Sequence, residues 1–303
     1  MIPFKLKNLG KLFKTTFSEW YNKDPFRQSA IIAYYAIFSI PGLLVLVIAI
    51  AGYFFDRDTV NQNLIAQISE TIGSEPALQI QEVLSKSTAE KSTAWGSIVG
   101  ITILLLGATG VFVELQKTLN LIWNVKVKPQ SGIWLIIKAR LFSFGLILAI
   151  AFLLMISLVI STGLAAMSNY IQFESSPLMM TIYGILNFII SLLVISVLFA
   201  MIFKILPDAK IEWKHVWLGS LVTGLLFTIG KMCLAYYFGK AEPASVYGTA
   251  GSIILILLWV SYSSMILFFG AEFTATYAKM YSGTIPPTKI AKVEIPTALE
   301  KTL

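Results

Sequence analysis

The chain has 303 residues, of which 56% are hydrophobic and only 13% are charged, and its formal net charge is +7 at pH 7. Soluble domains carry roughly 25% charged residues, so this composition predicts a polytopic membrane protein. The single cysteine and the single histidine exclude a disulfide framework, a Cys/His metal cluster and a Cys-His catalytic couple. A basic balance can indicate nucleic-acid binding, but in an apolar chain it more often reflects lysines and arginines on cytoplasmic loops.

Residues 1–28 form a basic amphipathic segment in which lysines alternate with leucine and phenylalanine. This pattern suits a helix on the inner leaflet, with its basic groups near anionic head groups. The alternative is a solvated lead-in that only supplies positive charge for orientation. A cleavable signal peptide is not expected, because the first apolar run is too long for the core of one.

The first predicted span covers residues 29–55 and has Pro41 near its middle. A proline at this position removes one backbone hydrogen bond and clashes with the preceding turn, so a kink is expected. The kink is either a packing feature or a break whose freed carbonyls line a cavity, as in the helices of transporters.

The polar stretch that follows, residues 56–94, contains two short helical patterns. The apolar positions of the first pattern are Val60, Leu64, Ile65, Ile68 and Ile72. The stretch is therefore predicted to be an extracytoplasmic helical hairpin between spans one and two. Its apolar stripes must bury against the ends of the spans, the membrane surface or a second copy of the chain, so a homo-oligomer is one of three open interpretations.

Five further apolar runs are long enough to cross a hydrocarbon core of roughly 30 Å at about 1.5 Å per residue. They are residues 95–113, 141–171, 178–203, 216–238 and 245–271. With the first run they predict an all-α membrane domain, residues 29–280, built as a bundle of six transmembrane helices. The remaining tail, residues 281–303, has no apolar periodicity and is predicted to be a disordered cytoplasmic segment.

The basic residues are distributed unequally between the two sides of this bundle. Eighteen of the 23 lysines and arginines fall on the segments that share a side with the N-terminus, four fall on the other side, and Lys231 lies within a span. The positive-inside rule then predicts a multi-pass membrane protein with both termini in the cytoplasm. Orientation accounts for the basic surplus, so no nucleic-acid partner is predicted.

Charged residues in or beside the spans are the first candidates for a substrate pathway or a gate. Glu114, Arg140, Lys204 and Glu272 all fall at predicted inner helix ends, where opposite charges can pair at the level of the head groups. They either anchor the helices at the interface or form a gate whose ion pairs break and re-form. Lys231 lies in the outer half of the fifth span and needs either a partner or a stem that reaches upward to water.

Small residues indicate which spans pack together. Gly219, Ser220 and Gly224 on span five, and Gly248 and Gly251 on span six, would let helix backbones approach closely. Spans one, five and six are therefore predicted to form a three-helix core, with Lys231 facing protein and not lipid. In this arrangement Pro41 bends span one around a polar gap, and the gap would be lined by Tyr34, Ser39 and Ser261.

Four segments of the chain carry a family resemblance. They are AYYAIFSIPGLL (33–44), LNLIW (119–123), LPDAKIEWKHVWLGS (206–220) and YGTAGSIILILLWVSYSSMILFFGAEF (247–273). In combination they resemble the YihY/BrkB family of bacterial membrane proteins, which has also been labelled ribonuclease BN-like. The resemblance implies six spans, an inner-membrane location, and roles in virulence-related resistance or envelope lipid transport that have been suggested for some members. It implies no set of catalytic residues.

The sequence is interpreted as an inner-membrane protein that transports or handles a lipid or another amphipathic envelope component, with membrane lipids as its partners. Two alternatives are a non-transporting envelope scaffold or virulence and resistance factor, and a ribonuclease. RNA cleavage usually needs metal-binding carboxylates or histidines on a soluble surface, so the nuclease label is regarded as a misnaming. No catalytic residue, metal site or cofactor is predicted, and the protein is not expected to be an enzyme.

Overall fold

The computed structural model describes residues 9–54, 57–72, 77–78, 80–82, 110–128, 177–241, 251–283, 285–288 and 290–293. The chain is mostly helical, as the sequence predicts, with one small two-stranded sheet. The elements are α1 (Leu9–Asn22), α2 (Pro25–Phe54), α3 (Arg57–Ile72), β1 (Val125–Val127), α7 (Pro177–Ile205), α8 (Trp213–Ala241), α10 (Gly251–Ser282) and β2 (Ala291–Val293). Residues 110–122 are also helical.

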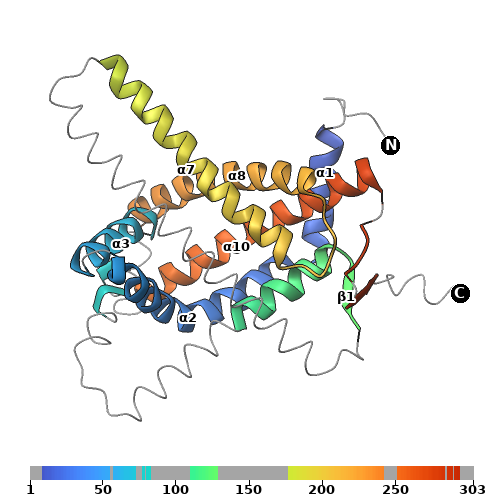
Figure 1. The fold of residues 1–303 in the computed structure, drawn as a ribbon, viewed down its shortest axis with the longest axis horizontal. Coiled ribbons are helices and arrows are strands. Elements are labelled where there is room, and N and C mark those ends of the chain that lie inside the picture. The colour runs from blue at the N-terminus through green and yellow to red at the C-terminus, as the bar shows by residue number, and fades with distance from the viewer. Residues whose placement is uncertain are drawn as a thin grey trace, which may run out of the picture.

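Helix α10 is the centre of the described structure (Figure 1). It packs against both α2 and α8, while α7 packs against α8. Ser261 of α10 bonds to Ser29 of α2, whereas Gly270 packs on Thr223 of α8. Nine residues rotate a helix by about 900°, two and a half turns, so these two contacts lie on opposite sides of α10. Ala271, Ala275 and Ala278 are buried along α10, and small side chains of this kind allow neighbouring elements to approach the backbone.

Among the described residues, three helices contain segments long and apolar enough to cross a membrane: Gly184–Ile205, Trp213–Phe238 and Ile253–Tyr281. They correspond to predicted spans four, five and six, and α2 covers the first. Most of predicted spans two (95–113) and three (141–171) lies outside the described residues.

The sixth span continues beyond the end that the sequence predicts for it. It was expected to stop at residue 271, but α10 continues to Ser282, for a total of 32 residues or about 48 Å. The polar residues that follow residue 271 do not end the helix, because Glu272, Thr274 and Thr276 are all buried against other parts of the protein. Tertiary packing here overrides the loss of hydropathy on which the boundary was based.

Part of the tail is ordered, contrary to the prediction of a disordered segment from residue 281. Strand β2 pairs antiparallel with β1, with Lys126 opposite Lys292. An isolated bridge joins Ala209 to Pro287, and the Lys210 amide donates to the carbonyl of Pro286. Strand pairing needs only backbone groups and a matching edge, so the tail gains order from β1 and from the α7–α8 loop without an apolar periodicity of its own.

Helix α3 occupies the first half of the predicted hairpin. Its Ile65 and Ile68 pack against a small cluster formed by Leu44 of α2 and Ile80, which also contacts Ile256 and Trp259 of α10. Of the second predicted helix, residues 77–78 and 80–82 are described and are helical. In this structure the stripe of α3 is therefore buried against the ends of α2 and α10.

Candidate functional site

Glu272 is the most deeply buried acidic group of the described chain. Its side chain has no exposed surface, and its Oε2 accepts a hydrogen bond of 2.8 Å from Nζ of Lys23, whose side chain is 16% exposed. Lys23 follows α1 directly, and Nζ also donates to the carbonyl of Ile122, at 3.3 Å. One ammonium group therefore joins the N-terminal segment, the helix of residues 110–122 and α10.

The pair lies at a small hollow lined by residues from four segments. These are Trp20, Lys23, Pro25, Gln28, Thr118, Ile122, Phe268 and Glu272. Thr118 donates to Oε1 of Gln28 at 3.1 Å, which closes one side of the hollow. Oε1 of Glu272 has no hydrogen-bond partner in the described structure. Because burying an unpaired charge is costly, Lys23 helps to hold the end of α1 against α10.

A second polar cluster lies where the α7–α8 loop meets the helix of residues 110–122. Asp208 is buried, and its Oδ2 accepts hydrogen bonds from Asn120 at 2.8 Å and from Gln116 at 3.1 Å. Oδ1 of Asn120 in turn accepts from the backbone amide of Asp208, at 2.7 Å. The Thr288 amide donates to the carbonyl of Asp208, so the same residue also holds the tail.

Helices α8 and α10 interlock through glycine and threonine. A Cβ atom added to Gly219 would overlap the Thr274 side chain, and one added to Gly270 would overlap Thr223. Each threonine hydroxyl is satisfied within its own helix, because Thr223 donates to the carbonyl of Gly219 and Thr274 to that of Gly270. The close approach predicted for Gly219 is present, and Thr223 and Thr274 are the side chains that fill the space.

Lys231 lies on α8 beside α10. It lines a narrow hollow with Phe227, Leu234, Trp259, Tyr262, Ser263 and Ile266. On the neighbouring turn, Gly230 faces Tyr262 and Ile266, and an added Cβ would lie 2.8 Å and 2.7 Å from their side-chain carbons. Lys231 thus faces α10. No carboxylate of the described residues forms an ion pair with it.

The predicted polar gap between spans one and six is not built from the residues proposed for it. Tyr34 is 59% exposed and packs edge-on against Tyr35 and Phe38. Ser39 is buried, but its hydroxyl donates to the Ala36 carbonyl of its own helix.

Ser261 does contact span one, through a hydrogen bond of 3.1 Å to the hydroxyl of Ser29. Helix α2 continues through Pro41 without the break considered for it. Among the described residues, Ser261 makes no hydrogen bond to Tyr34 or Ser39.

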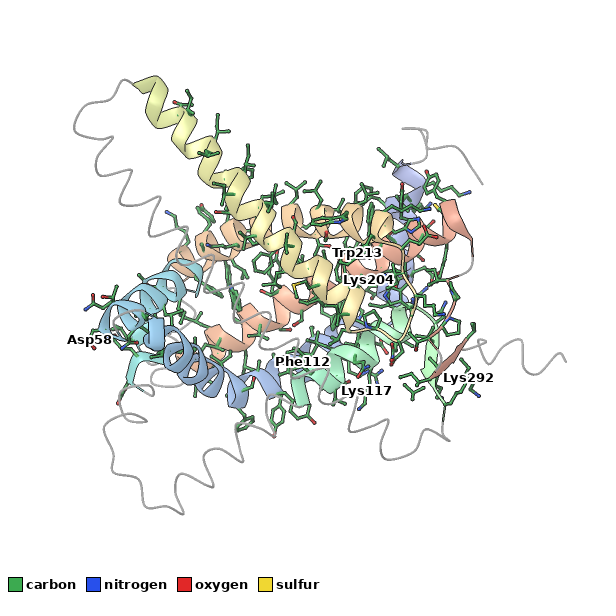
Figure 2. All side chains as sticks on the ribbon, in the orientation of Figure 1. Asp58, Phe112, Lys117, Lys204, Trp213 and Lys292 are labelled. Atoms are coloured by element: carbon green, nitrogen blue, oxygen red, sulfur yellow. The ribbon has the colours of Figure 1, made fainter. Side chains whose placement is uncertain are left out.

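The remaining charged candidates do not gather into one gate. Glu114 lies inside the helix of residues 110–122, not at its end, and pairs with Lys117 at 3.4 Å. Lys204 lies at the end of α7, donates to the Ile211 carbonyl and is 5.5 Å from the centre of the Trp213 ring (Figure 2). Arg140 lies outside the described residues.

The small residues have equally separate positions. Ser220 is buried and donates to the carbonyl of Trp217 in its own helix. Gly224 faces Ser196 of α7, so span five packs on span four at this glycine. Gly251 is buried at the start of α10, and Gly248 lies outside the described residues.

Several site residues were not singled out from the sequence. Lys23 was counted only as one of many basic residues at the N-terminus, while Asn120 and Asp208 lay within segments used for the family resemblance. A carboxylate and an amide in otherwise apolar surroundings are a usable signal of a buried polar cluster. The partner of Glu272 gave no such signal, because Lys23 is distant in sequence.

These features define the class of the protein: an α-helical polytopic membrane protein whose helices are joined by buried polar contacts at one end. The sequence pattern of the virulence factor BrkB family matches residues 16–293. The chain therefore belongs to the virulence factor BrkB family.

Relatives of the chain include proteins named UPF0761 membrane protein. One from Saccharophagus degradans is 25% identical over 277 residues, which cover 89% of this chain and 60% of the relative. One from Verminephrobacter eiseniae is 25% identical and is matched over 54% of its length. The chain thus spans a little over half of these two relatives. One from Haemophilus influenzae is 26% identical over 89% of this chain and 95% of its own length. No solved structure matches the chain.

Proposed function

We propose that this membrane protein binds and moves an anionic amphipath, such as a phospholipid, along the contact between α8 and α10. The observation that carries the proposal is the position of Lys231 in the hollow beside Trp259 and Tyr262. Ionisable side chains within membrane-crossing segments usually face the protein interior and mark a substrate or ion pathway. Lys231 faces α10, so it is a candidate for such a pathway. Its ammonium would pair with the phosphate or carboxylate of the head group.

The surface of α8 supports an amphipathic ligand. Leu221, Leu225 and Ile229 recur at four-residue spacing and are exposed. Lys231 lies about 200° around the helix from Ile229, so this row offers acyl chains an apolar surface on α8 but no direct track to the ammonium. The head group would meet the ammonium at the edge of the narrow crevice beside Trp259 and Tyr262, and the chains would remain at the apolar surface.

Lipid movement in vesicles tests this proposal. The purified protein is placed in vesicles with a fluorescent phosphatidylglycerol, and bleaching by an impermeant reductant reports how fast the lipid changes leaflet. A hydrogen bond to a charged group contributes about 1.5–3 kcal/mol, so Lys231→Met should slow the movement about 10- to 100-fold. Lys231→Arg should retain it, and Lys240→Met, which removes a charge near the end of the same helix, is the matched control.

The scaffold alternative has one observation in its favour, the interlocked glycines and threonines between α8 and α10. Packing of this kind favours a rigid pair of helices. If vesicles with the unaltered protein move lipid no faster than empty vesicles, the scaffold is the better account. If the lipid moves but Lys231→Met moves it equally fast, the pathway lies elsewhere.

A further inference from the structure

We propose that α1 lies in the plane of the cytoplasmic membrane surface and docks on anionic phospholipids through an exposed aromatic stripe and two lysines. The stripe consists of Phe13, Phe17 and Tyr21, and the lysines are Lys11 and Lys14. This surface is separate from the Lys231 hollow, and the inference does not depend on the proposed function.

The first argument is the angle at which α1 meets α10. Phe13 packs on Phe273 with ring centres 5.3 Å apart, Trp20 packs on Phe269 at 5.9 Å, and Lys23 bonds to Glu272. These contacts extend over ten residues of the N-terminal segment, from Phe13 to Lys23, or about 15 Å. Their partners on α10 lie within little more than one helical turn. The two helices therefore cross steeply, as Figure 1 also shows. If α10 spans the membrane, α1 therefore lies roughly parallel to the membrane surface.

The second argument is the division of α1 into three faces. Leu12 and Thr16 are buried and Trp20 is half-buried, and this face packs against the protein. Phe13, Phe17 and Tyr21 are 42%, 56% and 60% exposed, and the Phe17 and Tyr21 rings stack at 6.3 Å.

Lys11, Lys14 and Ser18 are exposed beyond the aromatic stripe. Successive residues of an α-helix turn by about 100°, so the aromatic stripe lies between the protein-facing residues and the lysines. Glu19, the acidic residue of α1, falls on the far side of the helix from the stripe.

This order of faces fits a helix that rests on a leaflet beside its own bundle. The protein-facing residues hold α1 to α10, the aromatic rings enter the boundary between head groups and acyl chains, and the lysines reach the phosphates. A solvated lead-in would not require three exposed aromatic rings in register.

The third argument is the level of α1 along the bundle. Phe273 of α10 contacts Phe13, while the next turn of α10 contacts the beginning of α8 through the rings of Tyr277 and His215, 5.7 Å apart. Trp213 and Trp217 at that end of α8 are 50% and 48% exposed. Tryptophan is enriched where membrane and water meet, so α1 is at the height of an interface. The distribution of basic residues predicts that this interface is the cytoplasmic one.

The test places spin labels on neighbouring residues of α1 in the full chain, with Cys233 replaced by serine to remove the native thiol. Phe17→Cys reports on the stripe and Ser18→Cys on the face beside it, in nanodiscs that contain either phosphatidylglycerol or only phosphatidylcholine. In phosphatidylglycerol we expect the label at 17 to be relaxed by oxygen and at least threefold less accessible to a water-soluble nickel complex than the label at 18.

A charge-reversal pair tests the part played by the lysines. Lys11→Glu with Lys14→Glu should raise the nickel accessibility of the label at 17 in phosphatidylglycerol. Lys210→Glu with Lys292→Glu makes the same change of charge at two exposed residues away from α1 and should leave the label unchanged.

Three results would overturn the inference. Equal nickel accessibility at 17 and 18 in phosphatidylglycerol would place α1 in water. Dipolar broadening between labels at 17 that disappears on dilution with unlabelled protein would assign the stripe to a second copy of the chain. Insertion that is the same in both lipids and unaffected by Lys11→Glu with Lys14→Glu would also refute the claim that anionic head groups are recognised.

Discussion

Glu272 and Lys231 both place a formal charge within segments apolar enough to cross a membrane, but their surroundings differ. Glu272 is fully buried and joined to Lys23 at 2.8 Å. Lys231 lies beside two aromatic rings and has no ion pair with a described carboxylate. A charge with a built-in partner holds helices together, whereas a charge that faces a hollow is available to a ligand. The comparison separates a structural site from a candidate binding site on two adjacent helices.

The largest expected effect follows from breaking the buried pair. Glu272→Ala leaves the Lys23 ammonium without its carboxylate, and removing one partner of a buried ion pair typically costs about 3–5 kcal/mol of unfolding free energy. Unfolding in mixed detergent micelles, followed by circular dichroism, measures the loss.

The double variant Lys23→Met with Glu272→Leu removes both charges and should regain most of that stability, because an apolar replacement of a buried pair is often neutral. If the double variant is as unstable as Glu272→Ala, the pair is not what joins α1 to α10.

A smaller loss of stability is expected from changes to the glycine contacts between α8 and α10. Gly219→Ala places a methyl group against Thr274 and should cost about 1–3 kcal/mol in the same unfolding measurement. Gly184→Ala is the matched control, since nothing lies within 4 Å of an added Cβ there. Alanine is favoured over glycine inside a helix, so the control should be neutral or slightly stabilising. Equal responses at both positions would show that α8 and α10 are not closely packed.

A still smaller effect on stability is expected at the candidate binding site. Lys231→Met removes a cation that has no carboxylate partner among the described residues, so the free energy of unfolding should change by less than about 0.5 kcal/mol. The same variant should lose lipid movement. A destabilisation as large as that of Glu272→Ala would remove the difference between the two charges and make Lys231 a structural residue.

The smallest effect is expected at the exposed pair where the α7–α8 loop meets the first turn of α8. Nζ of Lys214 is 2.6 Å from Oε2 of Glu212, and this hydrogen bond with its charge holds the pKa of Glu212 below the ordinary 4.5. A lowered pKa in the folded state contributes stability above the unfolded value and loses it as the pH falls through the folded value.

Both side chains are more than 60% exposed, so Glu212→Gln should leave the melting temperature at pH 7 unchanged. An NMR titration of the Glu212 carboxyl should give a midpoint below 4.5 that rises in Lys214→Ala. A midpoint that is the same in both proteins would show that the contact does not persist in solution.

Hydropathy located the helices α2, α7, α8 and α10 because apolar length is a local property of the sequence. It misplaced the end of α10 by more than ten residues. The polar residues after residue 271 are buried by contacts with α1 and α8, which are distant in sequence. Similarly, β2 could not be predicted from the tail alone, because a strand of three residues is defined by its partner β1.

The candidate site divides in the same way. Lys231 was recognised from the sequence because a charge inside an apolar run is conspicuous without any knowledge of its neighbours. Glu272 was recognised too, but its placement at a helix end was wrong. Tyr34 and Ser39 were assigned to a gap that they do not line, because residue type does not reveal which face of α2 meets α10.

Composition and apolar length determined from the sequence alone that this is a helical membrane protein, and four short segments carry its resemblance to the BrkB family, since each of these depends on local residues. Only the tertiary structure decided that Lys23 is the partner of Glu272 and that Asp208 joins three segments. It also decided that α1 crosses the bundle with its aromatic stripe exposed. Those contacts link residues far apart in the chain, and their energies depend on burial and distance, which exist only after the helices have packed.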